Sequence, residues 1–231
     1  MANSALRVLI RLIYFSFLLI PLYVIYQNSG GLAGIQKTLQ HSSLTIYMLL
    51  RLTGLYAFFM IFLQIMLGGF MPIWQNIFGP KATVNHEKLG LITYILVLSH
   101  PTFFLVGALL RKGLEGFYTT LVPQFITKTD ALLNYGRLGF TLITLAVFAS
   151  YFRHKSFLNR HWIKFHILNY FAFCFLFLHS WNIGSDTQIF PLNYIYPVMA
   201  GLVSLSVAYR FVPRLNSLAR RGLAKLNTKN A

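Results

Sequence analysis

Six long apolar runs divide the 231-residue chain and limit its fold more than any other feature. They cover approximately residues 5-26, 44-70, 89-110, 135-152, 162-181 and 191-212. Each is near the ~20 residues that an α-helix needs to cross ~30 Å of hydrocarbon. None alternates with the period of a barrel strand, so the helix is the expected spanning structure. The runs predict an all-α integral membrane protein, a six-transmembrane-helix bundle forming a single domain (1-231).

Basic residues between the runs set the predicted orientation. The chain has 20 Lys and Arg against four Asp and Glu, but they are not gathered in one patch, so membrane topology explains them better than nucleic-acid binding. Fourteen lie at the N-terminus, in the second and fourth loops and in the tail; the other six are Lys37, Arg51, Arg111, Lys112, Lys128 and Arg137. Both termini are therefore expected to be cytoplasmic, in what we predict is a bacterial cytoplasmic membrane.

The two ends of the chain carry their own predictions. The N-terminal MANSALRVLIRLIYF resembles a signal peptide, but no small-residue cleavage site follows and the apolar run reaches Tyr26, which favours a retained first span. Residues 213-231 are expected to be a short basic cytoplasmic tail that lies on anionic lipid. That tail is too short for a flavin or nicotinamide domain, and the sequence has no GxGxxG or GxxxxGK[ST] motif. The electron donor is therefore expected to be a separate flavoprotein or a lipid-soluble quinol.

Four histidines lie in two of the runs. His86 and His100 bracket NHEKLGLITYILVLSH, and His166 and His179 lie within RHWIKFHILNYFAFCFLFLHS. Their separations correspond to ~21 and ~20 Å along a helix. Because both spans run outward, His86 matches His166 near the inner side and His100 matches His179 near the outer side. An imidazole in hydrocarbon needs a partner. A haem iron takes axial ligands on opposite faces, so these four residues are the expected metal ligands of two b-type haems between the third and fifth helices.

Helical phase leaves alternatives to this prediction. Fourteen steps at 100° return within ~40° of the start, whereas 13 steps leave His166 and His179 ~140° apart, so the fifth helix is expected to be distorted or to present its ligands from different sides. If only one level assembles, the chain is a single-haem redox subunit. The alternative from another class is a haem-free transporter or assembly factor, in which the histidines are hydrogen-bonded core residues. Zinc is disfavoured, because two imidazoles per level do not make a tetrahedral site. The remaining histidines, His41, His154 and His161, are expected at the surface.

Two arginines are candidates for contacts with haem. Arg51 lies about two turns inside the outer end of the second span and is expected to pair with a propionate of the outer haem, since a guanidinium matches a carboxylate bidentately. Arg137, at the outer end of the fourth span, is a second candidate. The alternative for both is snorkelling toward the headgroups.

Other polar residues have simpler expected roles. Gln64, Thr93 and Asn169 lie within spans and are expected to form interhelical hydrogen bonds. Cys174 is the only cysteine, which excludes disulfides, and is expected to be a small core residue. Four basic residues lie on the predicted inner side: Lys88, Arg153, Arg160 and Lys164. They are expected to contact inner propionates or an acidic donor protein, or to be ordinary positive-inside residues.

The histidine spacing resembles a known family. His-x13-His on the third span and His-x12-His on the fifth look like the ferric-reductase-like transmembrane domain, as do His86-x-x-Leu89-Gly90, Trp162-x-x-x-His166 and the run 51–55, RLTGL. Similar domains occur in NADPH oxidases, ferric reductases and the haem-binding membrane subunit of bacterial methionine sulfoxide reductase systems (MsrQ). The resemblance covers roughly residues 44–181, although Glu87 stands where the family often has a basic residue.

The resemblance implies a cytochrome b that acts as an oxidoreductase component. It implies an extracytoplasmic electron acceptor: a partner reductase, ferric iron or oxygen. Because no flavin-nicotinamide domain follows the sixth span, the stand-alone type of subunit is the closer likeness, with flavin or quinone supplied separately.

Overall fold

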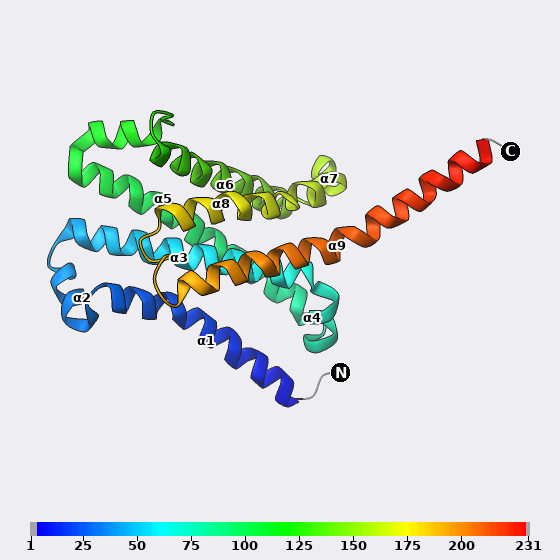
Figure 1. Cartoon of the computed structure of the whole chain (residues 1–231), viewed down its shortest axis with the longest axis horizontal. Helices are drawn as coiled ribbons and strands as arrows, with labels where there is room; N and C mark the ends of the chain where they lie inside the picture. The colour runs from blue at the N-terminus through cyan, green and yellow to red at the C-terminus, as the bar shows by residue number, and fades with distance from the viewer. Residues whose placement is uncertain (1–3, 230–231) are drawn as a thin grey trace.

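The computed structural model describes the backbone of residues 4–229 and the side chains of residues 4–212. That part of the chain is helical, without a strand (Figure 1). Its helices are α1 (Ser4–Asn28), α2 (Gly31–Leu39), α3 (Ser42–Gly69), α4 (Met71–Phe78), α5 (Lys81–Leu121), α6 (Lys128–Tyr151), α7 (Ser156–His166), α8 (Leu168–Ile183) and α9 (Leu192–Lys229). Five of the described helices are long and apolar enough to cross a membrane, and the bent pair α7–α8 counts as a sixth candidate when its two helices are taken as one span. The predicted all-α architecture is confirmed for the described residues, and its long apolar helices are typical of an integral membrane protein.

Short helices fill segments that the sequence predicts as loops. Among them are α2 and α4, and the indole nitrogen of Trp74 ties α4 to α3 by donating to the Met66 carbonyl at 3.0 Å. Helix α5 begins well before the predicted span and is interrupted near its other end at Gly113, whose φ of 62° favours glycine. The apolar runs therefore locate the spans correctly but underestimate how far the helices continue beyond them.

Helix α3 occupies the middle of the bundle. It packs against α1, α5, α8 and α9, and its sequence is apolar on every side, as expected of a helix surrounded by others. Phe59 of α3 and Tyr196 of α9 are both fully buried, and Phe58 of α3 stacks on the Tyr196 ring with 4.5 Å between ring centroids. The core therefore lies along α3.

The outward surfaces of the spans are strongly apolar. Leu12 of α1 is 59% exposed, Leu91 of α5 is 61% exposed and Phe171 of α8 is 58% exposed. Such surfaces match a hydrocarbon solvent better than water. Cys174 also faces outward, so the expectation that it is a core residue is wrong. Its neighbours Ala172 and Phe173 take the buried face of α8 instead.

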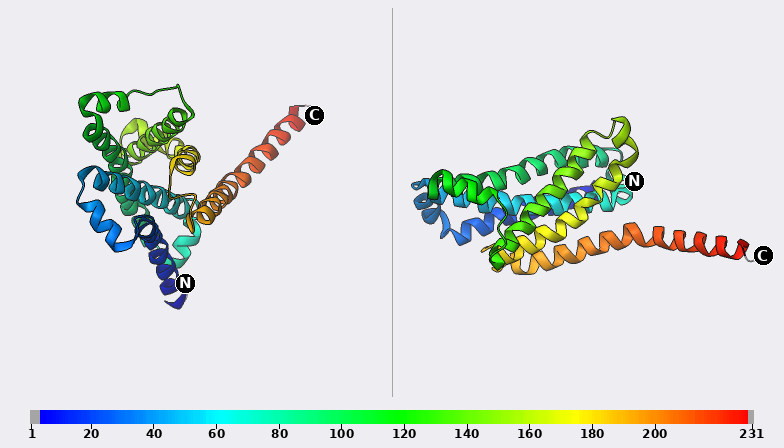
Figure 2. Two further views of the ribbon diagram at one scale, coloured as in Figure 1. Left: turned by 60° about the vertical axis from the view of Figure 1, so that its left-hand side comes forward. Right: turned by 90° about the horizontal axis from the view of Figure 1, so that it is seen from above.

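The backbone of α9 continues through the segment predicted as a separate tail. It runs beyond the rest of the bundle (Figures 1 and 2). The predicted amphipathic face of residues 213-231 depends on side chains outside the described part of the chain.

Two helical hairpins organise the molecule around the histidines. Helix α3 packs on α5, and α6 packs on α8, whereas α5 and α8 make at most sparse backbone contact with each other. The histidine side chains span the space between the hairpins. His86 meets His166 and His100 meets His179, so α5 and α8 run in the same direction, as predicted.

Candidate haem-ligand site

Two pairs of imidazoles face each other between the hairpins. The ring centroids of His86 and His166 are 6.0 Å apart, and those of His100 and His179 are 6.3 Å apart. The ring planes cross at 83° and 79°. We call the first pair the inner level and the second pair the outer level, following the predicted orientation. The structure therefore brings together all four histidines in the pairs expected from their depths.

A bend between α7 and α8 explains how His166 and His179 can both face α5, although their spacing is one residue shorter than that of His86 and His100. The two helices meet at 41°, and the break falls at Ile167, directly after His166. On an ideal helix the two rings would be ~140° apart. The predicted distortion of the fifth span is thus confirmed, and it is located beside the inner ligand.

Main-chain carbonyls fix the rings of the outer level. Nδ1 of His100 lies 3.1 Å from the Leu50 carbonyl oxygen, and Nδ1 of His179 lies 2.9 Å from the Leu132 carbonyl oxygen. A carbonyl only accepts, so each Nδ1 carries the proton and each Nε2 has a free lone pair. That is the tautomer that a metal ligand needs.

Side chains contact the rings of the inner level. Ser150 Oγ lies 2.9 Å from His166 Nδ1, and it also lies 2.8 Å from the Ala146 carbonyl, its own i−4 oxygen. The hydroxyl has one proton, which it donates to that carbonyl, so its oxygen accepts from His166. The amide nitrogen of Asn169 is 3.5 Å from the same Nδ1, and it makes no hydrogen bond there because an amide nitrogen cannot accept the Nδ1 proton.

Gln64 is the side-chain partner of His86. With its amide oriented to match its neighbours, the nitrogen lies 2.8 Å from His86 Nδ1 and the oxygen lies 3.2 Å from the Gly90 amide nitrogen. This orientation fits a ring with its proton on Nε2. If Nε2 of His86 were to hold a metal, its proton would have to lie on Nδ1, and the Gln64 amide would have to turn so that its oxygen accepts. Gln64 thus makes the predicted interhelical contact, and its partner is a candidate ligand. Asn169 lies beside His166 of its own bent span, and Thr93 donates to the Leu89 carbonyl of its own helix at 2.7 Å, so the interhelical hydrogen bond predicted for Thr93 is wrong.

Glycines let three of the rings lie directly on the neighbouring helix. A Cβ at Gly54 would come within 2.8 Å of the His100 ring, and a Cβ at Gly136 would come within 2.8 Å of the His179 ring. At Gly68 a Cβ would be 3.3 Å from the His86 ring. Sequence analysis missed these glycines as site residues. Their signal is the spacing, because Gly54 and Gly68 are as far apart in the sequence as the two histidines that they face.

The spacing of each pair matches two ligands of one metal ion. An imidazole nitrogen lies about 2 Å from a transition metal that it binds. The centre of a five-membered ring with bonds of about 1.33 Å lies roughly 1.1 Å from each ring atom. Two rings on opposite sides of one metal therefore have centres roughly 6 Å apart. Edge-to-face aromatic contacts fall in the same range. The repetition at two depths, and the absence of any hydrogen bond to the four Nε2 atoms among the described residues, favour the ligand interpretation.

The donor set fits iron in a planar macrocycle. No three His, Cys, Asp or Glu side chains converge on one point in the described chain, so each level offers two imidazoles and no third ligand of these four types. A haem iron takes its four equatorial ligands from the porphyrin and needs only two axial ones. The glycine surfaces of α3 and α6 hold the rings in place, and the region midway between the levels is packed, with Phe173, Ile143 and Ile61 buried.

Arg51 has a protein partner that sequence analysis missed. Its Nε donates to Asp186 Oδ2 at 2.8 Å, and a terminal nitrogen donates to Oδ1 of the same carboxylate. Asn28 also donates to Asp186, at 2.6 Å, and Asp186 is 3% exposed. This cluster joins α1, α3 and the loop after α8. Pairing of Arg51 with a haem propionate stays a prediction, and the only signal for Asp186 is its rarity as one of four acidic residues.

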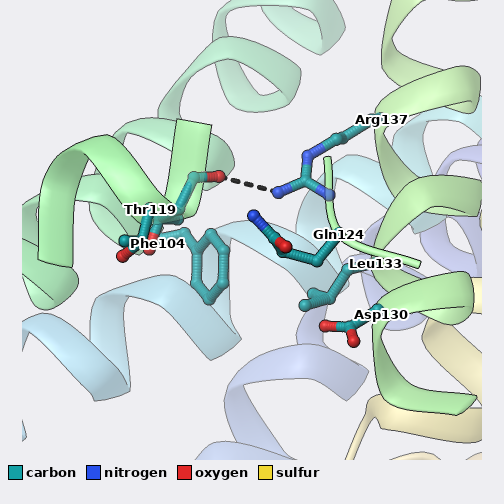
Figure 3. A pocket seen from close by; sticks show the side chains of 7 residues that line it. Phe104, Thr119, Gln124, Asp130, Leu133 and Arg137 are labelled. Carbon is teal, nitrogen blue, oxygen red and sulfur yellow. Dashed lines mark hydrogen bonds between the residues drawn. The ribbon is translucent and has the colours of Figure 1, made fainter. Parts of the chain in front are cut away.

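Arg137 lies at a cavity of about 240 Å³ between the end of α5 and the start of α6. Figure 3 shows its guanidinium with Phe104, Gln124 and Asp130 around this space. It donates to the Thr120 carbonyl at 2.7 Å, along the dashed line of Figure 3, and to the Asn134 side chain. Its predicted contact with a propionate is likewise untested.

The remaining predicted residues lie outside the two levels. His41 and His154 are exposed, as expected, and His161 is half-buried against Phe157, with 5.6 Å between ring centroids. Among the inner basic residues, Arg153 pairs with Glu87 at 2.9 Å. This contact joins α5 to the turn after α6.

A scan against models of known families, a search of curated proteins and a search of solved structures each found no match for this chain.

Proposed function

We propose that this protein is a transmembrane electron-transfer subunit with two b-type haems, ligated by His86 and His166 at the inner level and by His100 and His179 at the outer level. It would carry electrons from a cytoplasmic flavoprotein or quinol to an extracytoplasmic acceptor, which the family resemblance narrows to a partner reductase, ferric iron or oxygen. It would thus be an oxidoreductase component that works with partners.

The observation that carries this proposal is the meeting of two imidazole pairs, 6.0 and 6.3 Å apart, at two depths of one bundle. A single pair would be an ordinary aromatic contact. Two pairs separated by ~21 Å along α5 support the proposal, because haems bound at these levels would lie toward opposite ends of the bundle. Electron transfer across a membrane needs this arrangement.

The chain itself supplies ligands, orientation and insulation. When bound, an iron porphyrin supplies reversible one-electron chemistry. His86 with His166, and His100 with His179, would each hold a bound haem with two neutral imidazoles, which favours electron transfer over direct binding of oxygen. The Leu50 and Leu132 carbonyls hold the outer rings in the ligating tautomer. Buried apolar side chains such as Phe173 exclude water between the levels.

Haem content and difference spectra test the proposal. Dithionite-reduced minus oxidised spectra of membranes should show low-spin b-type haem, and a pyridine haemochrome assay on purified protein should give two haems per chain. His100→Ala and His166→Ala should each lose one of the two. The exposed His41 provides the matched control, so His41→Ala should keep both.

Other results would favour the alternatives. One haem per chain in the wild type would support the single-haem subunit. Wild-type protein without a Soret band after haem-replete expression would reject the redox function and favour a transporter or assembly factor.

A further inference from the structure

The four imidazoles occupy equivalent places on α3 and α6. Each lies beside the second of two helix positions that are four residues apart, and its Nδ1 is linked to the first of them, directly in three cases and through the Ser150 hydroxyl in the case of His166. The pairs of positions are Leu50 with Gly54 and Leu132 with Gly136 at the outer level, and Gln64 with Gly68 and Ala146 with Ser150 at the inner level. The step in sequence from the outer level to the inner level is the same on both helices. The hairpins are thus built on one repeated register.

Ser150 is the exception in this register. Three of the four rings face a glycine at the second position, and only His166 faces a side chain there. The hydroxyl lies between ring and helix, accepting from His166 Nδ1 at 2.9 Å and donating to the Ala146 carbonyl at 2.8 Å. At the equivalent outer position, His179 reaches the Leu132 carbonyl directly at 2.9 Å.

This difference has an electronic consequence if the rings are haem ligands. An acceptor at Nδ1 pulls on the ring proton, makes the imidazole more basic and stabilises the oxidised metal. At the outer level the acceptor is a backbone atom, which substitution cannot remove. At the inner level it is a side chain, so the sequence itself can adjust the ligand.

We infer that Ser150 is a positioning residue that fixes the tautomer of His166 and thereby sets the reduction potential of the inner haem independently of the outer one. This inference rests on the proposed function. Gln64 has the corresponding place beside His86, so both inner ligands are adjustable through side chains while neither outer ligand is.

Redox potentiometry on purified protein, followed at the haem absorption band, tests this inference. Ser150→Ala removes the acceptor, so one of the two components should shift to higher potential while the other stays in place. Ser150→Thr restores a hydroxyl and should bring that component back. The control is Ser204→Ala, because Ser204 makes the same i−4 bond, to the Ala200 carbonyl at 2.9 Å, on an exposed face of α9.

Each result decides the inference. A shift of one component in Ser150→Ala, reversed in Ser150→Thr and absent in Ser204→Ala, supports it. Loss of one haem in Ser150→Ala with retention in Ser150→Thr also supports it, since only the hydroxyl differs in kind. Unchanged potentials, an equal shift of both components, or loss of haem in both Ser150 variants would overturn it. A wild type without haem would instead reject the proposed function, so the two failures are distinguishable.

Discussion

The α3–α5 hairpin and the α6–α8 hairpin present matching pairs of histidines by different means. On α5, the spacing of His86 and His100 is close to a whole number of helical turns, so a regular helix places both on one face. On the second hairpin the spacing is one residue shorter, and a 41° bend at Ile167 compensates for the missing residue. The depth and direction of the four histidine rings are therefore matched between the two hairpins, whereas the regularity of the helices that carry them is not.

Deleting one residue of α5 should have the largest effect, because it destroys the alignment of His86 and His100 on one face of the helix. Removing Ile92, which is 50% exposed and lies between the histidines, turns His86 by about 100° relative to His100 without supplying a bend. One level then loses a ligand. We expect the pyridine haemochrome ratio to fall from two haems per chain to one. Ile92→Ala, which keeps the spacing, should leave two, and a deletion variant that also keeps two would show that α5 does not set the phase.

The two outer arginines, one on α3 and one on α6, have different kinds of partner. Arg51 pairs with a carboxylate that is buried, whereas Arg137 donates only to neutral oxygens in the described structure. Asp186→Asn leaves the Arg51 charge without a counterion and should destabilise the protein by about 3–5 kcal/mol. Thermal unfolding in detergent, followed by circular dichroism, measures this loss.

A paired variant sharpens the test of Asp186. Arg51→Met combined with Asp186→Leu should recover most of the lost stability, because neither charge is then left alone. Arg137→Met should cost less than Asp186→Asn. If Asp186→Asn is harmless and Arg51→Met instead loses the outer haem, the propionate is the true partner of Arg51.

The histidine pairs and the spans could be predicted because both depend on position along one helix. Apolar length gives the spans, and residue spacing gives the depth of His86, His100, His166 and His179. Contacts between two segments depend on how they pack, which residue spacing along one helix does not reveal. Sequence analysis therefore identified neither Asp186 as the partner of Arg51 nor Gly54 as a residue that faces His100. The spacing of His166 and His179 predicts a bend, but its place at Ile167 depends on how α7 packs, which periodicity does not encode.

The glycines provide a test in which the two hairpins should respond alike. An alanine at Gly54 or Gly136 pushes the facing ring away from its carbonyl, since the new Cβ would lie 2.8 Å from it. Losing such an outer contact typically weakens metal binding by about 10–100-fold. We expect Gly54→Ala and Gly136→Ala to weaken binding at the outer level, measured by haem titration of protein expressed without haem.

A glycine in open space serves as the control for these variants. Gly201 on α9 has no atom within 4 Å of an added Cβ, so Gly201→Ala should leave haem binding unchanged. It should slightly stabilise the helix, by about 0.5–1 kcal/mol. Equal losses in Gly201→Ala and Gly54→Ala would mean that ring packing against α3 is unimportant.

The smallest effect is expected where the hairpins touch at the inner end. Glu87 beside His86 pairs with Arg153 at 2.9 Å, but the two side chains are 49% and 33% exposed. Exposed pairs contribute about 0–1 kcal/mol, so Glu87→Gln should change the unfolding temperature little and should leave both haems bound. Loss of the inner haem in Glu87→Gln, with no loss in Arg153→Gln, would show that Glu87 acts on His86 directly. The hairpins would then be distinguished at the inner level by a charge as well as by Ser150.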